Sequence, residues 1–237
     1  MTSTVRVPTW TNHHSGPTSA EVIEDIFAVH TRINDPHRSR SVTVLDLTYG
    51  RGTFWAWNWS RAIELYGADL YMTAPDMERA PTTFFSGVDF QSAAKLFGAG
   101  MFDVVVFDPP HSAVGPQSAA LSTGEQWSDR YGSSRTQGVD NFQDIARMLI
   151  AGLGQALEIA REMVIVKTKP VVEAGKYRDA LYLADREIYR ATWHVEDRIY
   201  LAGGIPQPSG RGVEHFRGML STFIVAKPGV GGLSGWL

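Results

Sequence analysis

The chain has 237 residues, of which 43% are hydrophobic, and this size and composition suit a single α/β domain with one core. It contains no cysteine, which excludes disulfides and thiolate metal sites. The adjacent His13 and His14 are too close together to share a helical face, so no metal site is expected. No apolar run is long enough to span a membrane and no signal peptide is visible, so we expect a cytoplasmic protein.

The chain begins with a polar segment and a short helix. We expect a polar arm, a single domain and a glycine-rich tail, at residues 1–17, 18–228 and 229–237. Thr18 and Glu21 have the spacing of a capping box, which predicts a helix that continues to Ile33. This helix would pack beside the first candidate site along the chain.

That candidate site follows a first predicted strand, which begins at Val42 and ends in an acid and a glycine turn. The acid is Asp46, and the turn contains Gly50 and Gly52. Glycine permits positive φ and has no Cβ, so the backbone of such a turn can approach a ligand closely. The pattern therefore predicts a ligand-binding loop at the end of the strand.

The glycine turn differs from two other nucleotide-binding loops. A dinucleotide-binding loop has the pattern Gly-x-Gly-x-x-Gly, and its third glycine would fall at Trp55. No Gly-Lys-Ser/Thr follows, which excludes a Walker loop. An ordinary strand-to-helix turn is the alternative, because the amphipathic segment Thr53–Leu65 comes next.

Two further strands are predicted before the centre of the chain. Leu70–Ala74 is predicted to be the second strand and Thr82–Phe85 the third. Asp76 follows the second strand, where a carboxylate can accept the hydrogen bonds of both ribose hydroxyls, and Asp69 is a competing candidate. Surface turn chemistry is the alternative explanation for Asp76, and also for Asp89, which follows the third strand.

The most informative stretch is a buried-strand pattern that ends in an acid, two prolines and a ring. The run Val104–Phe107 is apolar and rich in β-branched residues, which predicts a strand covered on both faces. Pro109 and Pro110 fix φ and cannot extend a ladder, so Asp108 and His111 are expected on a rigid turn. Open α/β sheets bind ligands at this edge. A Pro-Pro turn that simply closes a strand is the alternative.

The rest of the chain continues the alternation of helices and strands. Residues 112–139 are poor in aliphatic side chains and form a long loop, which is either functional or a linker with incidental aromatics. Helical periodicity and buried-strand patterns then predict, in order, the helix Asn141–Ala160, the strand Met163–Lys167, the helix Tyr177–Tyr189, and the strands Trp193–Leu201 and Met219–Ala226.

The motif Asp108–His111 resembles the Asp-Pro-Pro-aromatic catalytic motif of S-adenosylmethionine-dependent methyltransferases, such as phage and bacterial DNA methylases, that methylate exocyclic amino groups of nucleobases. The resemblance implies that Asp108 and the Pro109 carbonyl accept the N–H bonds of the amine, on a turn fixed by Pro110. His111 would provide the ring that stacks on the base. The family usually has Tyr, Phe or Trp at this fourth position.

The pattern of Asp46, Gly50 and Gly52 is similar to the S-adenosylmethionine loop of the same methyltransferases, which implies S-adenosylmethionine as the cofactor. Asp76 would bind the ribose, and Asp89 lies where the family often has an acid near the adenine. The implied cofactor contacts are Asp46, Leu47, Thr48, Tyr49, Gly50, Gly52, Thr53, Asp76, Asp89 and Phe90.

Candidate substrate contacts come from the two long loops. Aromatic and basic side chains in residues 112–139 could stack on a flipped base and pair with phosphates. The run Glu214–Arg217 resembles the His/Arg-rich run before the last strand of these DNA methylases. The implied substrate contacts are Trp127, Arg130, Tyr131, Arg135, His215 and Arg217.

The order of the motifs, with the cofactor motif first, implies a Rossmann-like class I methyltransferase. This α/β fold has a mostly parallel seven-stranded sheet with an antiparallel C-terminal hairpin and helices on both faces. The first hypothesis is a DNA methyltransferase that acts on adenine N6 or cytosine N4. The alternatives are an RNA base methyltransferase, a small-molecule or protein-amine methyltransferase, and a non-catalytic Rossmann module that binds a cofactor or a partner.

The charge balance favours the small-molecule alternative. The chain has 22 Lys and Arg against 25 Asp and Glu, a net charge of −3, whereas tight nucleic-acid binders are commonly basic. A local concentration of basic residues, low affinity or a partner subunit would also fit a nucleic-acid substrate. The basic residues expected near the carboxyl edge of the sheet or in its loops are Arg130, Arg135, Lys167, Lys169, Arg198, Arg211 and Arg217.

Overall fold

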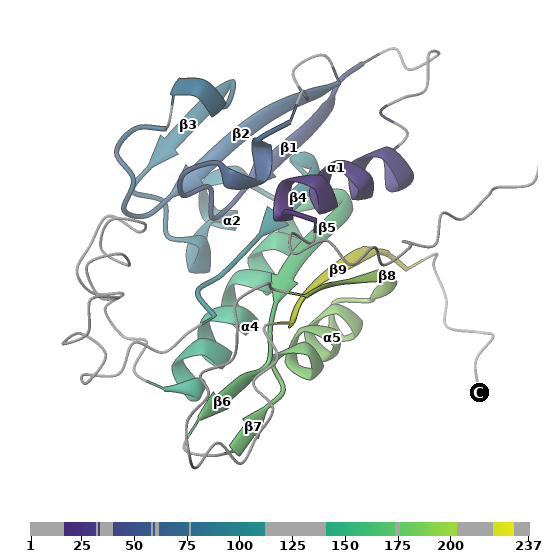
Figure 1. The fold of residues 1–237 in the computed structure, drawn as a ribbon. Coiled ribbons are helices and arrows are strands. Elements are labelled where there is room, and N and C mark those ends of the chain that lie inside the picture. Colours follow the sequence, from purple (N-terminus) through teal and green to yellow (C-terminus); the bar gives the residue numbers. More distant parts are fainter. Residues whose placement is uncertain are drawn as a thin grey trace, which may run out of the picture.

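The computed structural model describes residues 17–31, 33, 40–57, 59, 62–75, 77–111, 141–173, 176–202 and 220–229. These residues contain a seven-stranded sheet in the order β3-β2-β1-β4-β5-β9-β8 (Figure 1). The five strands from β3 to β5 are parallel, and β9 is antiparallel to both of its neighbours. The strands of this sheet are β1 Val42–Asp46, β2 Ile63–Asp69, β3 Thr83–Ser86, β4 Phe102–Phe107, β5 Ala160–Thr168, β8 Trp193–Ala202 and β9 Leu220–Pro228.

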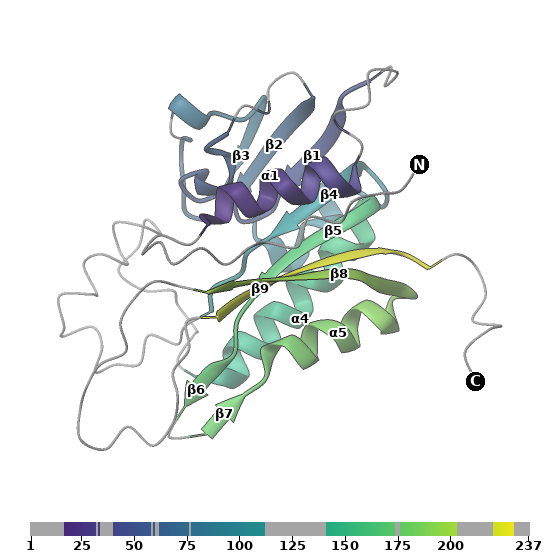
Figure 2. The same cartoon turned by 45° about the vertical axis from the view of Figure 1, so that its right-hand side comes forward.

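Helices cover both faces of the sheet. Helix α1, Ser19–His30, lies on one face, whereas α4, Phe142–Ile159, and α5, Ala180–Arg190, lie on the other (Figure 2). The short elements are the 3-10 turns η1 Thr53–Trp55, η2 Met77–Arg79 and η3 Phe90–Ser92, the helix α2 Ala94–Phe97, and a separate hairpin of β6 Val171–Glu173 and β7 Lys176–Arg178. The strand order, strand directions and helices are those of the Rossmann-like class I methyltransferase fold, as predicted.

Strand β4 shows how the sequence produces two cores. Its alternate side chains point to opposite faces of the sheet, and all six residues are buried. Val105 and Phe107 pack with α4 and α5, while Val104 and Val106 pack with α1. A central strand of a parallel sheet that is covered on both sides is therefore apolar throughout, which explains why its position could be predicted.

Side-chain caps fix where the two longest helices begin on each face. Thr18 and Glu21 form the expected capping box of α1, which ends at His30, three residues before the predicted end. Asn141 caps α4, so the helix begins at Phe142, one residue after the predicted start, and Asp144 completes its capping box. Helix α5 begins at Ala180, later than predicted, because Asp179 caps it and β7 occupies the residues before it.

The prediction of the second strand was wrong. Strand β2 is Ile63–Asp69, whereas Leu70–Ala74 forms bends and coil. The amphipathic segment Thr53–Leu65 contains η1 and the first residues of β2. Gly67 lies in the middle of β2 because the ring of Tyr49 covers it, and a Cβ there would lie 2.8 Å from that ring. The other predicted strands are confirmed within a few residues, and the β6–β7 hairpin was not predicted.

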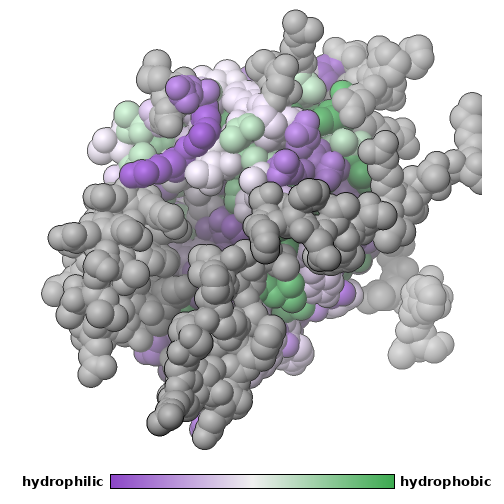
Figure 3. All heavy atoms as spheres, viewed as in Figure 1, coloured by the Kyte–Doolittle hydropathy of each residue, from purple (hydrophilic) through white to green (hydrophobic). Residues whose placement is uncertain are grey.

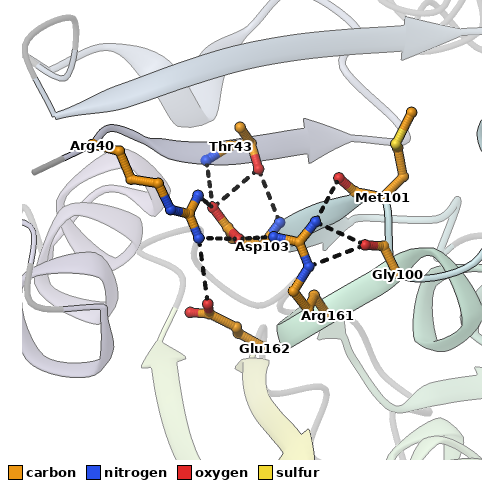
Figure 4. A network of polar contacts seen from close by, with 7 residues as sticks. All are labelled: Arg40, Thr43, Gly100, Met101, Asp103, Arg161 and Glu162. Atoms are coloured by element: carbon orange, nitrogen blue, oxygen red, sulfur yellow. Dashed lines mark hydrogen bonds and ion pairs between the residues drawn. The ribbon is translucent and has the colours of Figure 1, made fainter.

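Asp103 joins three strands at the edge of the sheet opposite the carboxyl ends of the parallel strands (Figure 4). Its fully buried carboxylate accepts hydrogen bonds from Arg40 at 2.6 and 3.0 Å, from Arg161 at 2.8 Å, and from the backbone and hydroxyl of Thr43 at 3.0 Å each. Burial raises the pKa of Asp103, but the hydrogen bonds from Arg40 and Thr43 hold it below its ordinary value. We call these four residues the Asp103 network.

Figure 3 shows hydrophilic and hydrophobic residues interspersed on the face that it displays. None of the described helices is long and apolar enough to cross a membrane. In the same described residues, no group of three His, Asp or Glu side chains could hold a metal ion.

Candidate active site

Three acids from three neighbouring strands meet at the carboxyl edge of the sheet. Asp46 ends β1, Asp69 ends β2, and Asp108 directly follows β4. Because β2, β1 and β4 are adjacent and parallel, their carboxyl ends lie at the same edge. The sequence therefore concentrates negative charge where open α/β sheets bind their ligands.

Asp46 is almost completely buried, with 2% of its surface exposed. Its two oxygens accept hydrogen bonds from the indole N–H of Trp55 at 2.8 Å and from the backbone N–H of Thr48 at 3.0 Å. Burial raises the pKa of Asp46 to about 7. The hydrogen bonds from Trp55 and Thr48 lower the pKa but do not offset burial, and the charges of Asp108 and Asp69 raise it by smaller amounts. The group therefore titrates near neutral pH.

The raised pKa of Asp46 predicts that stability falls as pH rises toward 8. The folded protein binds this proton more tightly than the unfolded chain. The stability that protonated Asp46 contributes is therefore fully present below pH 4 and is lost as the pH rises through 7. Between pH 5 and 8 the free energy of unfolding should fall by about 3 kcal/mol from this group. Asp46→Asn cannot titrate, so urea unfolding of this variant should show a smaller pH slope than wild type. An unchanged slope would contradict the assignment.

The two glycines of the loop lie in different surroundings. Both have positive φ, 52° at Gly50 and 64° at Gly52. A Cβ on Gly52 would lie 2.5 Å from the hydroxyl oxygen of Tyr49, so packing within the protein requires this glycine. A Cβ on Gly50 would be 3.9 Å from the nearest atom of the described residues, the carbonyl oxygen of Thr48, so within that part of the chain this side of the loop is open. The backbone N–H of Gly50 donates to Asp69 at 3.0 Å, which ties the loop to β2.

The Asp-Pro-Pro-His turn is linked to the glycine loop by a direct hydrogen bond. The backbone N–H of Asp108 donates to the hydroxyl of Thr48 at 2.7 Å. One carboxylate oxygen of Asp108 is 2.6 Å from His111 Nε2, and the other is 3.4 Å from Lys167 Nζ. Partial burial raises the pKa of Asp108, but His111 and Lys167 outweigh it and hold the carboxyl below its ordinary value. Asp108 is therefore an ionised acceptor beside the loop.

The remaining predicted cofactor residues lie in several environments. Leu47 and Tyr49 are buried, whereas Thr53 is exposed next to the loop. Asp89 caps η3 through the backbone N–H of Gln91 at 2.9 Å. Phe90 is 8% exposed and packs edge-on against Phe107 in the core. The predicted site residues outside the described residues are Asp76, Trp127, Arg130, Tyr131, Arg135, His215 and Arg217.

Two side chains at this edge were not assigned to the site from the sequence. Trp55 was used only to exclude a dinucleotide loop, yet it donates to Asp46. Lys167 was named among the basic residues but was not assigned to the site, and its ammonium contacts Asp108 and the hydroxyl of Ser19. A charged residue near the carboxyl end of a buried strand is the signal that could have identified Lys167.

The sequence of this chain has little similarity to known proteins. No protein-family model matches the chain, and no curated protein matches it. Similar solved structures include magnesium protoporphyrin IX methyltransferase from Synechocystis, with bound S-adenosylhomocysteine. The identity is 9%, with 88% of this chain and 82% of that chain covered and a TM-score of 0.49.

Two further structures are similar in the same range. A proposed RNA methyltransferase from Pyrococcus horikoshii has 13% identity over 90% of this chain and 84% of that chain, with a TM-score of 0.46. TrmN from Thermus thermophilus has 14% identity over 89% of this chain, with a TM-score of 0.47, and the match covers 50% of that protein. At these identities the likeness concerns the fold alone. The strand order and strand directions of the sheet, and not these matches, show the Rossmann-like class I methyltransferase fold.

Proposed function

We propose that this protein transfers a methyl group from S-adenosylmethionine to an exocyclic amino group of a nucleobase in DNA, at adenine N6 or cytosine N4. The observation that carries the proposal is the 2.7 Å hydrogen bond between Asp108 and Thr48. It joins the Asp-Pro-Pro-His turn to the glycine loop, so that the two motifs form one site at the carboxyl edge of the sheet.

The glycine loop and its acids would hold the cofactor. S-adenosylmethionine carries a positive sulfonium, which would supply the methyl group when bound, and the acids Asp46, Asp69 and Asp108 complement this charge. The open side of Gly50 would leave room for the ligand. Asp69 and Asp76 remain the two candidates for the ribose, and Asp69 already accepts three backbone N–H groups. We also propose that the other cofactor residues implied by the sequence contact S-adenosylmethionine.

Asp108 would make the amine a better nucleophile. The lone pair of an exocyclic amine is delocalised into its ring, so the amine attacks poorly. A carboxylate and the Pro109 carbonyl can accept its two N–H bonds, which localises the lone pair and orients it toward the methyl group. One proton must leave the nitrogen as the N–C bond forms. The ionised state of Asp108 suits it to accept those hydrogen bonds.

The cofactor assignment predicts a thermal shift. S-adenosylmethionine or S-adenosylhomocysteine at a hundredfold excess over Kd should stabilise the protein by about 2.7 kcal/mol, because it binds only the folded state. NAD and ATP are the controls, since the sequence lacks their loops, and both should shift the melting temperature less. A clear shift with NAD or ATP and none with S-adenosylmethionine would overturn the assignment.

The substrate is tested by direct identification of the product. The protein is incubated with labelled S-adenosylmethionine and, separately, duplex DNA, single-stranded DNA, RNA and free nucleosides, and the modified base is identified by mass spectrometry. N6-methyladenine or N4-methylcytosine in DNA is the expected product. Label confined to RNA, or found on no nucleobase in any arm, would refute the DNA assignment.

The net charge of −3 favours a second candidate, a small-molecule or protein amine as the methyl acceptor. Such a substrate would need no positive surface for phosphates. In this case the labelled methyl group would be absent from every nucleic acid, and an amine-containing small molecule or a lysine-rich peptide would take it. The Asp108 carboxylate could orient such an amine by the same hydrogen bonds.

The ring of His111 predicts a ranking of variants. His111→Phe and His111→Ala both lose the contact with Asp108, but if the ring stacks on the base, only the Ala variant should also lose about 1–3 kcal/mol of stacking, so Phe should be the more active variant. A general base predicts a different ranking, with Phe as inactive as Ala. Turnover of the wild type and both variants across pH separates the two roles. An Ala variant with wild-type turnover would exclude both.

A further inference from the structure

Lys167 is an enclosed cation at the carboxyl end of β5. Its side chain is only 16% exposed. The ammonium lies 5.1 Å from the ring centre of Phe54 and 5.6 Å from that of Phe223, and it is 3.3 Å from the hydroxyl of Ser19. These contacts come from η1, β9 and the first turn of α1. Aromatic faces attract a cation, so the position of the ammonium is fixed from several sides.

The same ammonium approaches Asp108 from the side opposite to His111. Lys167 Nζ is 3.4 Å from Oδ2, while His111 Nε2 is 2.6 Å from Oδ1. His111 belongs to the same turn as Asp108 and moves with it, whereas Lys167 is held by other elements of the fold. A carboxylate has about four acceptor positions, so both contacts leave room for an amine N–H.

We propose that Lys167 is a positioning residue for Asp108: its enclosed ammonium orients the carboxylate and keeps it ionised for the acceptance of the substrate amine. This role rests on the proposed methyl transfer, but the contact itself is independent of the substrate. A lysine that served only to fill the space between Phe54 and Phe223 would affect stability and leave the ionisation of Asp108 unchanged.

The charges that face Asp108 come from three elements. His111 lies on its own turn, Lys167 and Lys169 come from β5 and the residues after it, and Asp46 ends the neighbouring strand β1. The pKa of Lys169 is lowered by burial and by the charge of Lys167. With Lys167 removed, burial and the charge of Asp46 would be opposed by His111 and Lys169 alone, so the pKa of Asp108 should rise.

The first test measures the carboxyl group directly in the whole protein. Carbon-13 NMR of labelled aspartate follows the titration of Asp108 in wild type, Lys167→Met and Lys167→Arg. Lys167→Met should raise the pKa of Asp108, and Lys167→Arg should keep it low because the positive charge is retained. Lys227→Met is the matched control, because Lys227 also pairs with a carboxylate, Glu196 at 3.5 Å, but on another part of the sheet. An unchanged titration in Lys167→Met would overturn the proposal.

The second test uses the methyl-transfer reaction. Lys167→Met should lower kcat roughly tenfold at neutral pH, since losing a bond to a charged group typically costs at least that factor. It should also move the acid limb of the pH profile to higher pH, and Lys167→Arg should restore part of both. A loss of melting temperature with an unmoved limb would mean that Lys167 is only structural. If the wild type methylates no nucleobase, the proposed function fails, while the NMR titration still decides whether Lys167 controls Asp108.

Discussion

Asp108→Asn is expected to lower turnover by roughly 10²–10³-fold, the usual cost of losing one preorganised electrostatic contact. The substitution keeps the shape of the side chain but replaces an acceptor oxygen with an NH₂ donor, which cannot accept the amine N–H. It also removes the charge that His111 and Lys167 contact. Methyl transfer under saturating S-adenosylmethionine is the measurement.

The control for this variant is another aspartate that contacts a histidine. Asp197 is 3.3 Å from His30, on β8 and away from the carboxyl edge of the parallel strands, so Asp197→Asn should keep wild-type turnover. Asp108→Asn should still show the thermal shift with S-adenosylmethionine, which separates lost chemistry from lost binding. Wild-type turnover in Asp108→Asn would mean that this carboxylate does not act on the amine.

Asp103→Ala is expected to lower the free energy of unfolding by about 3 kcal/mol, which urea unfolding would measure. The substitution leaves Arg40 and Arg161 without their buried partner and removes the acceptor for Thr43. The two arginines are about half exposed, so water can solvate part of their charge, which places the loss at the low end for broken buried ion pairs.

Two comparisons sharpen this test. Glu196 pairs with His194 and Lys227 but is 39% exposed, so Glu196→Ala should cost less than 1 kcal/mol.

The pKa of folded Asp103 lies below its unfolded value near 3.8. The stability that ionised Asp103 contributes is therefore fully present above that pH and is lost as the pH falls below it. The difference between wild type and Asp103→Ala should therefore shrink in acid. Equal loss in both variants would rule out a special role for the Asp103 network.

The sequence predicted the buried strands well because their residues carry the signal locally. Val104–Phe107 and Met163–Lys167 are apolar on both faces, as a covered parallel strand requires. Strand β2 carries no such signal, since Glu64 and Gly67 interrupt its apolar residues. Gly67 is explained by the rings of Tyr49, 18 positions earlier, and Phe84 on β3, and single-sequence patterns do not contain such contacts.

The motifs of the candidate site could be predicted from the sequence, but the side-chain contacts within the site could not. The acid and the prolines after β4 were identifiable from types and spacing, because the turn is local. The pairing of Asp108 with Lys167 brings together residues 59 positions apart, and the bond of Asp46 to Trp55 depends on how η1 folds over the strand. The wrong placement of β2 also affected the ribose candidates, since Asp69 ends the strand that was predicted to begin after it.

The packing of Tyr49 has a consequence for how related sequences can diverge. Its ring occupies the space that side chains at both positions 52 and 67 would need. A smaller residue at position 49 would remove the closest of the contacts that require glycine at position 67 and leave the ring of Phe84, whereas any side chain at 67 would push the Tyr49 ring against the loop. In an alignment of homologues, these positions should therefore change together, with glycine at 67 tied to an aromatic residue at 49.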